Sequence, residues 1–179
     1  MGNIRAYTTY EASAAITAIV AGAACAQLKT QPAIDPGTGL QNIFVGLVRL
    51  EVILTTAVAS LLALAKPVAV GTSSTDTTGL KVGTALGGFA NGNGSILSTA
   101  WSAVPVVSST VYRREQLPAT IGAKLVWEWP EDNPFQNGDD LRRWIFAGKG
   151  ILLANLGVAA SAAMVVNYRW IEYSGVVTG

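Results

Sequence analysis

Histidine is absent from this chain, and cysteine occurs once, at Cys25. The first absence removes the most common general base and the most common metal ligand in proteins. The second excludes a disulfide within the chain and any zinc site built from several cysteines. Charged residues make up only 13% of the sequence, whereas an average soluble domain has about a quarter. These absences argue against an enzyme and indicate a surface that is poor in charge.

Long apolar runs are also missing. No uninterrupted run reaches the ~20 residues that a membrane-spanning helix needs, and the nearest candidate, residues 52–65, contains Thr55, Thr56 and Ser60. Hydrophobic residues nevertheless make up 50% of the chain. We therefore expect surface that is covered by other protein subunits, and no membrane partner. An anchor through residues 12–26 is an alternative that solubility without detergent would exclude.

Basic residues are not clustered. The net charge is +1, and the two basic pairs, at residues 113–114 and 142–143, each adjoin acidic residues. A protein that holds nucleic acid through its phosphates needs clustered lysine and arginine. The sequence therefore predicts no nucleic-acid partner.

Alternation with a period of two is clearest in the last third of the chain. Every second residue from Leu125 to Trp129 is large and apolar, and the same holds from Met164 to Trp170. The run from Gly150 to Gly157, bounded by glycines, has the length of a strand. We predict roughly three or four antiparallel strands here, with aromatic side chains on one sheet face.

A second alternating stretch covers residues 43–56. Its apolar face predicts one long half-buried strand, and Arg49 and Glu51 on the other face fit a ladder of surface charges. Residues 57–70 are ambiguous between helix and strand. The glycine- and threonine-rich residues 72–98 predict turns, with a strand near Leu80. Residues 113–119 are expected to turn the chain, with Pro118 at a strand end.

The first 42 residues are predicted from a different pattern. Ile16, Ile19, Val20 and Ala23 fit helical spacing within an alanine-rich segment, and residues 31–41 form a proline- and glycine-rich connector. We therefore predict an alanine-rich N-terminal helix or arm with its connector, residues 1–42. A β-sandwich domain, residues 43–179, follows.

Acidic residues gather between the predicted strands of the last third. They are Glu131, Asp132, Asp139 and Asp140, with Glu128 just before them. Carboxylate oxygens suit calcium, although this spacing matches no EF-hand loop. We predict a solvated loop with no cofactor, and keep a calcium site as the alternative. Glu128 with Glu131 or Asp132 could also cleave a glycoside, but neighbouring strand residues face opposite ways. We assign no catalytic residue.

All five tryptophans lie beyond residue 100. Four of them, Trp127, Trp129, Trp144 and Trp170, are candidates for an interface or for ligand contact. Alternation favours the core or a subunit contact, where aromatic side chains supply much of the packing energy. The alternative, a sugar platform, predicts that Trp127 or Trp129 lies exposed in a groove.

Four features of the chain resemble the single jelly-roll proteins of virus and bacteriophage particles, which include capsid, minor capsid and head-decoration proteins. These features are the long amphipathic strand at residues 47–56, the glycine- and threonine-rich middle, the Arg-x-x-Leu-Pro turn at 114–118 and the final Val-Asn-Tyr-Arg-Trp-Ile-Glu strand. The likeness covers about residues 43–173 and carries no functional residue across. It implies an all-β, antiparallel β-sandwich of jelly-roll type.

The resemblance and the composition together predict a structural virion protein. We expect a decoration, cement or minor capsid protein that forms a homo-oligomer, a trimer, and docks on a capsid shell. Coat proteins of this type that package RNA often have a basic N-terminal arm, whereas this N-terminus is nearly neutral. Two alternatives stay open. One is a carbohydrate-binding or adhesin module, such as a receptor-binding fibre domain, and the other is the major coat protein of a small capsid.

Overall fold

The computed structural model describes residues 7–19, 24–30, 42–85, 95–108, 110–130, 144–145, 149–157 and 162–175. Within these ranges the chain forms twelve β-strands and no helix. The strands are β1 (Tyr7–Ile19), β2 (Ala24–Thr30), β3 (Asn42–Leu54), β4 (Ser60–Ala65), β5 (Thr72–Thr78), β6 (Leu80–Ala85), β7 (Ser95–Ala103), β8 (Val111–Leu117), β9 (Lys124–Glu128), β10 (Trp144–Ile145), β11 (Gly150–Asn155) and β12 (Ala162–Gly175).

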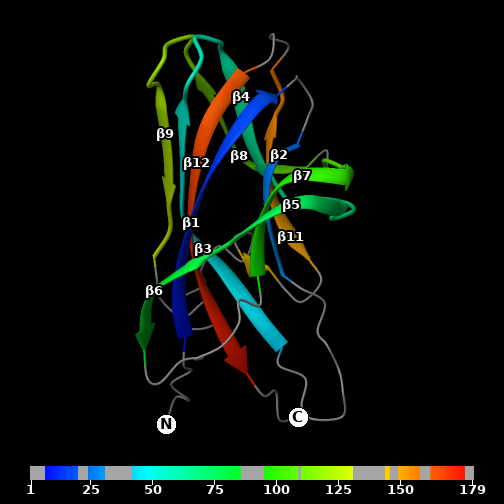
Figure 1. Ribbon diagram of the computed structural model, residues 1–179, viewed down its shortest axis with the longest axis vertical. Helices are drawn as coiled ribbons and strands as arrows, with labels where there is room; N and C mark the ends of the chain where they lie inside the picture. Colours follow the sequence, from blue (N-terminus) through cyan, green and yellow to red (C-terminus); the bar gives the residue numbers. More distant parts are fainter. Residues whose placement is uncertain are drawn as a thin grey trace.

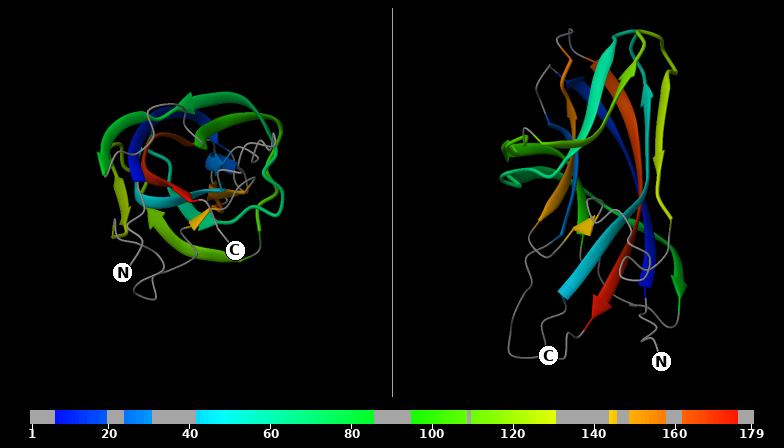
Figure 2. Two further views of the ribbon diagram at one scale, coloured as in Figure 1. Left: turned by 90° about the horizontal axis from the view of Figure 1, so that it is seen from below. Right: turned by 180° about the vertical axis from the view of Figure 1, so that it is seen from behind.

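The strands form two antiparallel sheets. The first sheet has the order β10, β3, β12, β1, β6, and β9 also pairs with β3. The second has the order β5, β7, β2, β11, β4, β8. The two sheets enclose a common interior, as the view from below in Figure 2 shows. The predicted all-β, antiparallel sandwich is confirmed.

The strand pairs are nested along the chain. β1 pairs with β12, and β2 pairs with β11. β12 and β11 then pair on their other sides with β3 and β4. These in turn pair with β9 and β8. One sheet therefore contains the series β1, β12, β3, β9, and the other contains β2, β11, β4, β8.

Three strands between β4 and β8 widen both sheets on the same side. β6 extends the first sheet by pairing with β1, and β7 extends the second by pairing with β2. β5 pairs with β7, and only Gly79 separates it from β6. The continuous ribbon of β5 and β6 therefore passes from one sheet to the other (Figure 1).

The core lies between the sheets and follows the predicted alternation. On β12, Met164, Val166, Tyr168 and Trp170 are at most 1% exposed. On β3 and β9 the residues predicted to face inward are buried as well. Each large apolar side chain buried in this way contributes about 1.5–3 kcal/mol to folding. The inward faces of the long strands thus hold the sandwich together.

The predicted N-terminal helix is wrong for the described residues, because this part of the chain forms β1 and β2. β1 lies between β12 and β6, and β2 lies between β7 and β11. Along β1, buried Tyr10, Ala12 and Ile16 alternate with exposed residues such as Glu11. That period is two, with small alanines filling inward positions. The long pairing with β12 outweighs the helix propensity of alanine.

The structure resolves one ambiguous segment and corrects one predicted turn. Residues 60–65, ambiguous in the sequence, form β4, which is paired on both sides. The predicted turn at residues 113–119 begins only after β8, which continues to Leu117. Pro118 follows immediately and ends the strand, as predicted. Sheet pairing with β4 keeps residues 113–117 extended.

Candidate functional site

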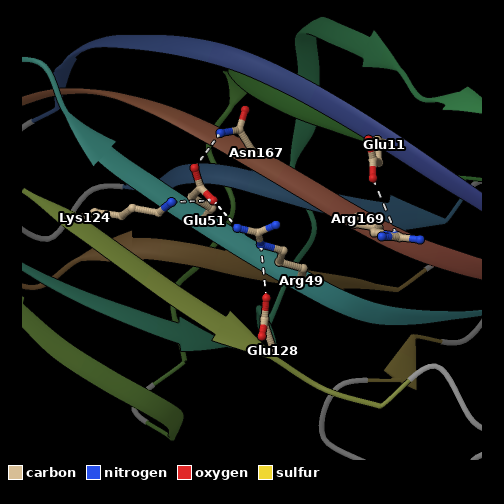
Figure 3. Close-up of polar contacts among 7 residues, drawn as sticks. All are labelled: Glu11, Arg49, Glu51, Lys124, Glu128, Asn167 and Arg169. Carbon is tan, nitrogen blue, oxygen red and sulfur yellow. Dashed lines mark hydrogen bonds and ion pairs between the residues drawn. The ribbon is translucent and has the colours of Figure 1, made fainter. Parts of the chain in front are cut away.

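The outer face of the first sheet has a row of four charged residues, one from each of four neighbouring strands. Across the sheet they are Glu11 of β1, Arg169 of β12, Arg49 of β3 and Glu128 of β9, each the register partner of the next. We call these residues the charged row (Figure 3). Its two central members are both arginines, and like charges directly opposite each other destabilise a sheet unless they are compensated.

Acidic neighbours compensate both arginines. Nε of Arg169 lies 3.5 Å from Oε1 of Glu11, and Nε of Arg49 lies 3.4 Å from Oε1 of Glu128. Nη2 of Arg49 also lies 2.5 Å from Oε2 of Glu51. The ladder of charges that the sequence predicts at Arg49 and Glu51 is confirmed by this ion pair.

Glu51 collects three donors. Besides Arg49, Nζ of Lys124 lies 3.1 Å from its Oε2, and Nδ2 of Asn167 donates to its Oε1 at 3.4 Å. The Glu51 side chain is only 12% exposed. Figure 3 shows the three donors converging on this carboxylate from β3, β9 and β12. Glu51 therefore connects three strands on one face of the sheet.

A groove of about 490 Å³ lies over the same face. We call it the sheet groove. Six of its polar lining residues come from β1, β3 and β12: Glu11, Ser13, Arg49, Glu51, Asn167 and Arg169. The ribbon of β5 and β6 adds Thr77, Thr78 and Leu80 at the edge of β1, where Leu80 pairs with Glu11. Sequence reasoning missed this groove because it depends on which strands are neighbours.

The tryptophans named in the sequence are mostly buried. Trp127, Trp129 and Trp170 are 5%, 8% and 0% exposed. Nε1 of Trp127 donates to Glu115 at 3.3 Å, and the guanidinium of Arg113 lies 4.6 Å from the Trp129 ring centroid. Because these rings are buried and contact other side chains, little of their surface is available to bind a sugar.

Trp144 and Trp170 occupy different places in the first sheet. Trp144 begins β10, where its backbone pairs with Gly46. The structure describes the backbone of this residue but not its side chain. The ring of Trp170 stacks on Tyr10 with centroids 5.9 Å apart. Trp127, Trp129 and Trp170 are buried, so these three rings do not form an exposed platform.

The acidic candidates Glu131, Asp132, Asp139 and Asp140 lie outside the described residues. Glu128, which precedes them, belongs to the charged row. Among the residues that the structure describes, no group of three or more histidine, cysteine, aspartate or glutamate side chains could hold a metal ion. The calcium alternative remains a prediction.

One buried carboxylate went unnoticed in the sequence. Glu172 of β12 is 4% exposed, accepts a hydrogen bond from Oγ of Ser95, and accepts another from Nε1 of Trp170 at 3.1 Å. Because Ser95 belongs to β7, this contact joins the two sheets. Burial, and then the charge of Glu172, raise the pKa of the Tyr10 phenol.

Two other buried groups, the Cys25 thiol and the Tyr168 phenol, are protonated at neutral pH. Burial raises the pKa of the Cys25 thiol to about 12, so the thiolate that would act as a nucleophile is scarce at neutral pH. Burial also raises the pKa of the Tyr168 phenol, which faces the interior. Neither group suits nucleophilic chemistry at neutral pH.

A polar network holds β5 against the second sheet. Nζ of Lys29 donates to Oγ of Ser73 at 2.6 Å, and Oγ of Ser73 donates to Oδ2 of Asp76 at 2.8 Å. Oγ of Ser98 donates to Oδ1 of Asp76 at 2.5 Å. The network links β5 to β7 and β2, while most β5 side chains are exposed. We call it the Asp76 network.

Three exposed valines lie just before β5 and just after β7. Backbone bonds join Val68 N to Val106 O at 2.9 Å and Val106 N to Ala69 O at 3.0 Å. Val68, Val104 and Val106 are 75%, 63% and 52% exposed. We call these three residues the valine bridge. An exposed apolar cluster of this kind is typical of a surface that contacts another protein.

The described part of the chain contains no helix with the length and hydropathy of a membrane span. Comparison with models of known protein families gives no match, and comparison with curated proteins gives none either.

Proposed function

We propose that this chain is a structural virion protein of jelly-roll type, which associates with copies of itself and docks on a capsid shell. The nested strand pairing supports the proposal most strongly. A jelly roll has eight strands in two sheets connected as two Greek keys. The series β1, β12, β3, β9 and β2, β11, β4, β8 are compatible with such a connection, if β5, β6 and β7 are one insertion and β10 is another. Jelly rolls occur in viral capsid proteins and in lectins.

The surface favours the capsid role over a lectin that uses tryptophan. Trp127 and Trp129, the aromatics best placed in the sequence for a sugar platform, are 5% and 8% exposed. The valine bridge instead presents apolar side chains to solvent, and charged residues are scarce in the whole chain. A protein that works as one of many contacting copies buries such surface in its interfaces.

In this proposal the protein is located in the virion as a closed homo-oligomer, a trimer, on the shell as a decoration, cement or minor capsid protein. The second candidate is the major coat protein itself. The nested strand pairing supports this candidate as well, because jelly rolls occur in viral capsid domains. The two candidates differ in the mass of the assembly.

A charge placed in the valine bridge tests the proposed contact between copies. In Val106→Lys the oligomer should dissociate at concentrations where the unchanged chain stays assembled, because an unpaired charge opposes burial in the interface. Val82→Lys is the matched control. Val82 has the same 52% exposure but lies on β6, away from the bridge.

The readout is native mass by light scattering, with circular dichroism to confirm folding. The proposal expects a lower mass for Val106→Lys and the unchanged mass for Val82→Lys. An unchanged mass for Val106→Lys, or an equal loss in both variants, would contradict the valine bridge as the contact between copies.

A further inference from the structure

We draw no further inference here: the strongest candidate, the exposed apolar tip at Ile121 of the turn between β8 and β9, carries none, because nothing in the part of the chain that the structure describes shows what covers it.

Discussion

At Glu51, three donors converge on a carboxylate that is 12% exposed. Replacing it in Glu51→Gln keeps the shape but leaves Arg49 and Lys124 without their shared acid. We expect a loss of about 1–2 kcal/mol in the free energy of unfolding, measured in urea. The control Glu128→Gln, at a side chain 67% exposed, should change stability by less than about 0.5 kcal/mol. Equal effects would contradict the central place of Glu51.

Gly79, between β5 and β6, lies close against the side chains of Trp170 and Tyr10. A Cβ atom there would lie 2.5 Å from Cζ2 of Trp170 and 3.0 Å from Cβ of Tyr10, and Trp170 is fully buried. Gly79→Ala should therefore destabilise the fold by about 2–3 kcal/mol.

Gly122→Ala separates this steric effect from backbone strain. Gly122 has a φ of +83° and no atom within 4 Å of an added Cβ, so its replacement should cost only about 1 kcal/mol. Chemical denaturation of both variants gives the comparison. A cost for Gly79→Ala no larger than that for Gly122→Ala would refute the close contact.

The raised pKa of the Cys25 thiol predicts how the free energy of unfolding changes at alkaline pH. Burial raises the pKa of its thiol to about 12, while the unfolded thiol titrates at about 8.5. Above that lower pKa the unfolded state has lost its proton and the native state retains it, so unfolding becomes more favourable as pH rises. Buried Tyr10 and Tyr168, whose pKa values are also raised, add to the effect.

Urea unfolding between pH 8 and pH 11 measures this dependence. The midpoint should be constant near neutrality and fall above about pH 9. In Cys25→Ala, which removes one of the titrating groups, the fall should be shallower. A midpoint that does not change up to pH 11 would contradict the buried, protonated state of these groups.

The inward positions of the long strands could be predicted from the sequence, but their neighbours could not. Alternation identified Trp127, Trp129 and Trp170 as one-face residues, and all three are buried. The charged row and Glu172 depend on strand register, which no local pattern encodes. Residues 158 positions apart, Glu11 and Arg169, become partners only when β1 pairs with β12.

At the level of elements, β5 depends on the Asp76 network. Asp76→Ala removes the acceptor of both Ser73 and Ser98, so β5 should open from β7 more easily. We expect amide hydrogen exchange in β5 to accelerate about fivefold, which corresponds to the loss of about 1 kcal/mol.

Ser74→Ala is the control for this experiment, because Ser74 is an exposed residue of the same strand outside the network. Its exchange rates should match those of the unchanged chain. If Asp76→Ala also left the β5 rates unchanged, the network would not be what holds the strand.

The N-terminal segment shows why local propensity misled the prediction. Its alanines favour a helix in isolation, but in β1 they occupy inward and outward positions of a strand that is paired on both sides. The same holds for β4, whose leucines and alanines would also suit a helix. Whether such a segment forms a central strand depends on the strands that it pairs with, and these lie far away in the sequence.

At the scale of the whole molecule, the two sheets are held together by the core and by polar contacts such as that between Ser95 and Glu172. The ribbon of β5 and β6 joins them on one side, and the turn between β8 and β9 joins them on the other (Figure 1). The valine bridge and the sheet groove lie on different elements of this frame. Variants in the valine bridge and in the sheet groove can therefore be compared independently.

The most direct test of the virion proposal is the native mass of the purified chain by light scattering over a dilution series. The proposal predicts a fixed small multiple of 18.6 kDa that does not change on dilution, with a trimer expected. Particles of megadalton mass would instead identify the chain as the shell-forming coat protein. A monomer at every concentration would contradict the proposal that this protein works by assembling with its own copies.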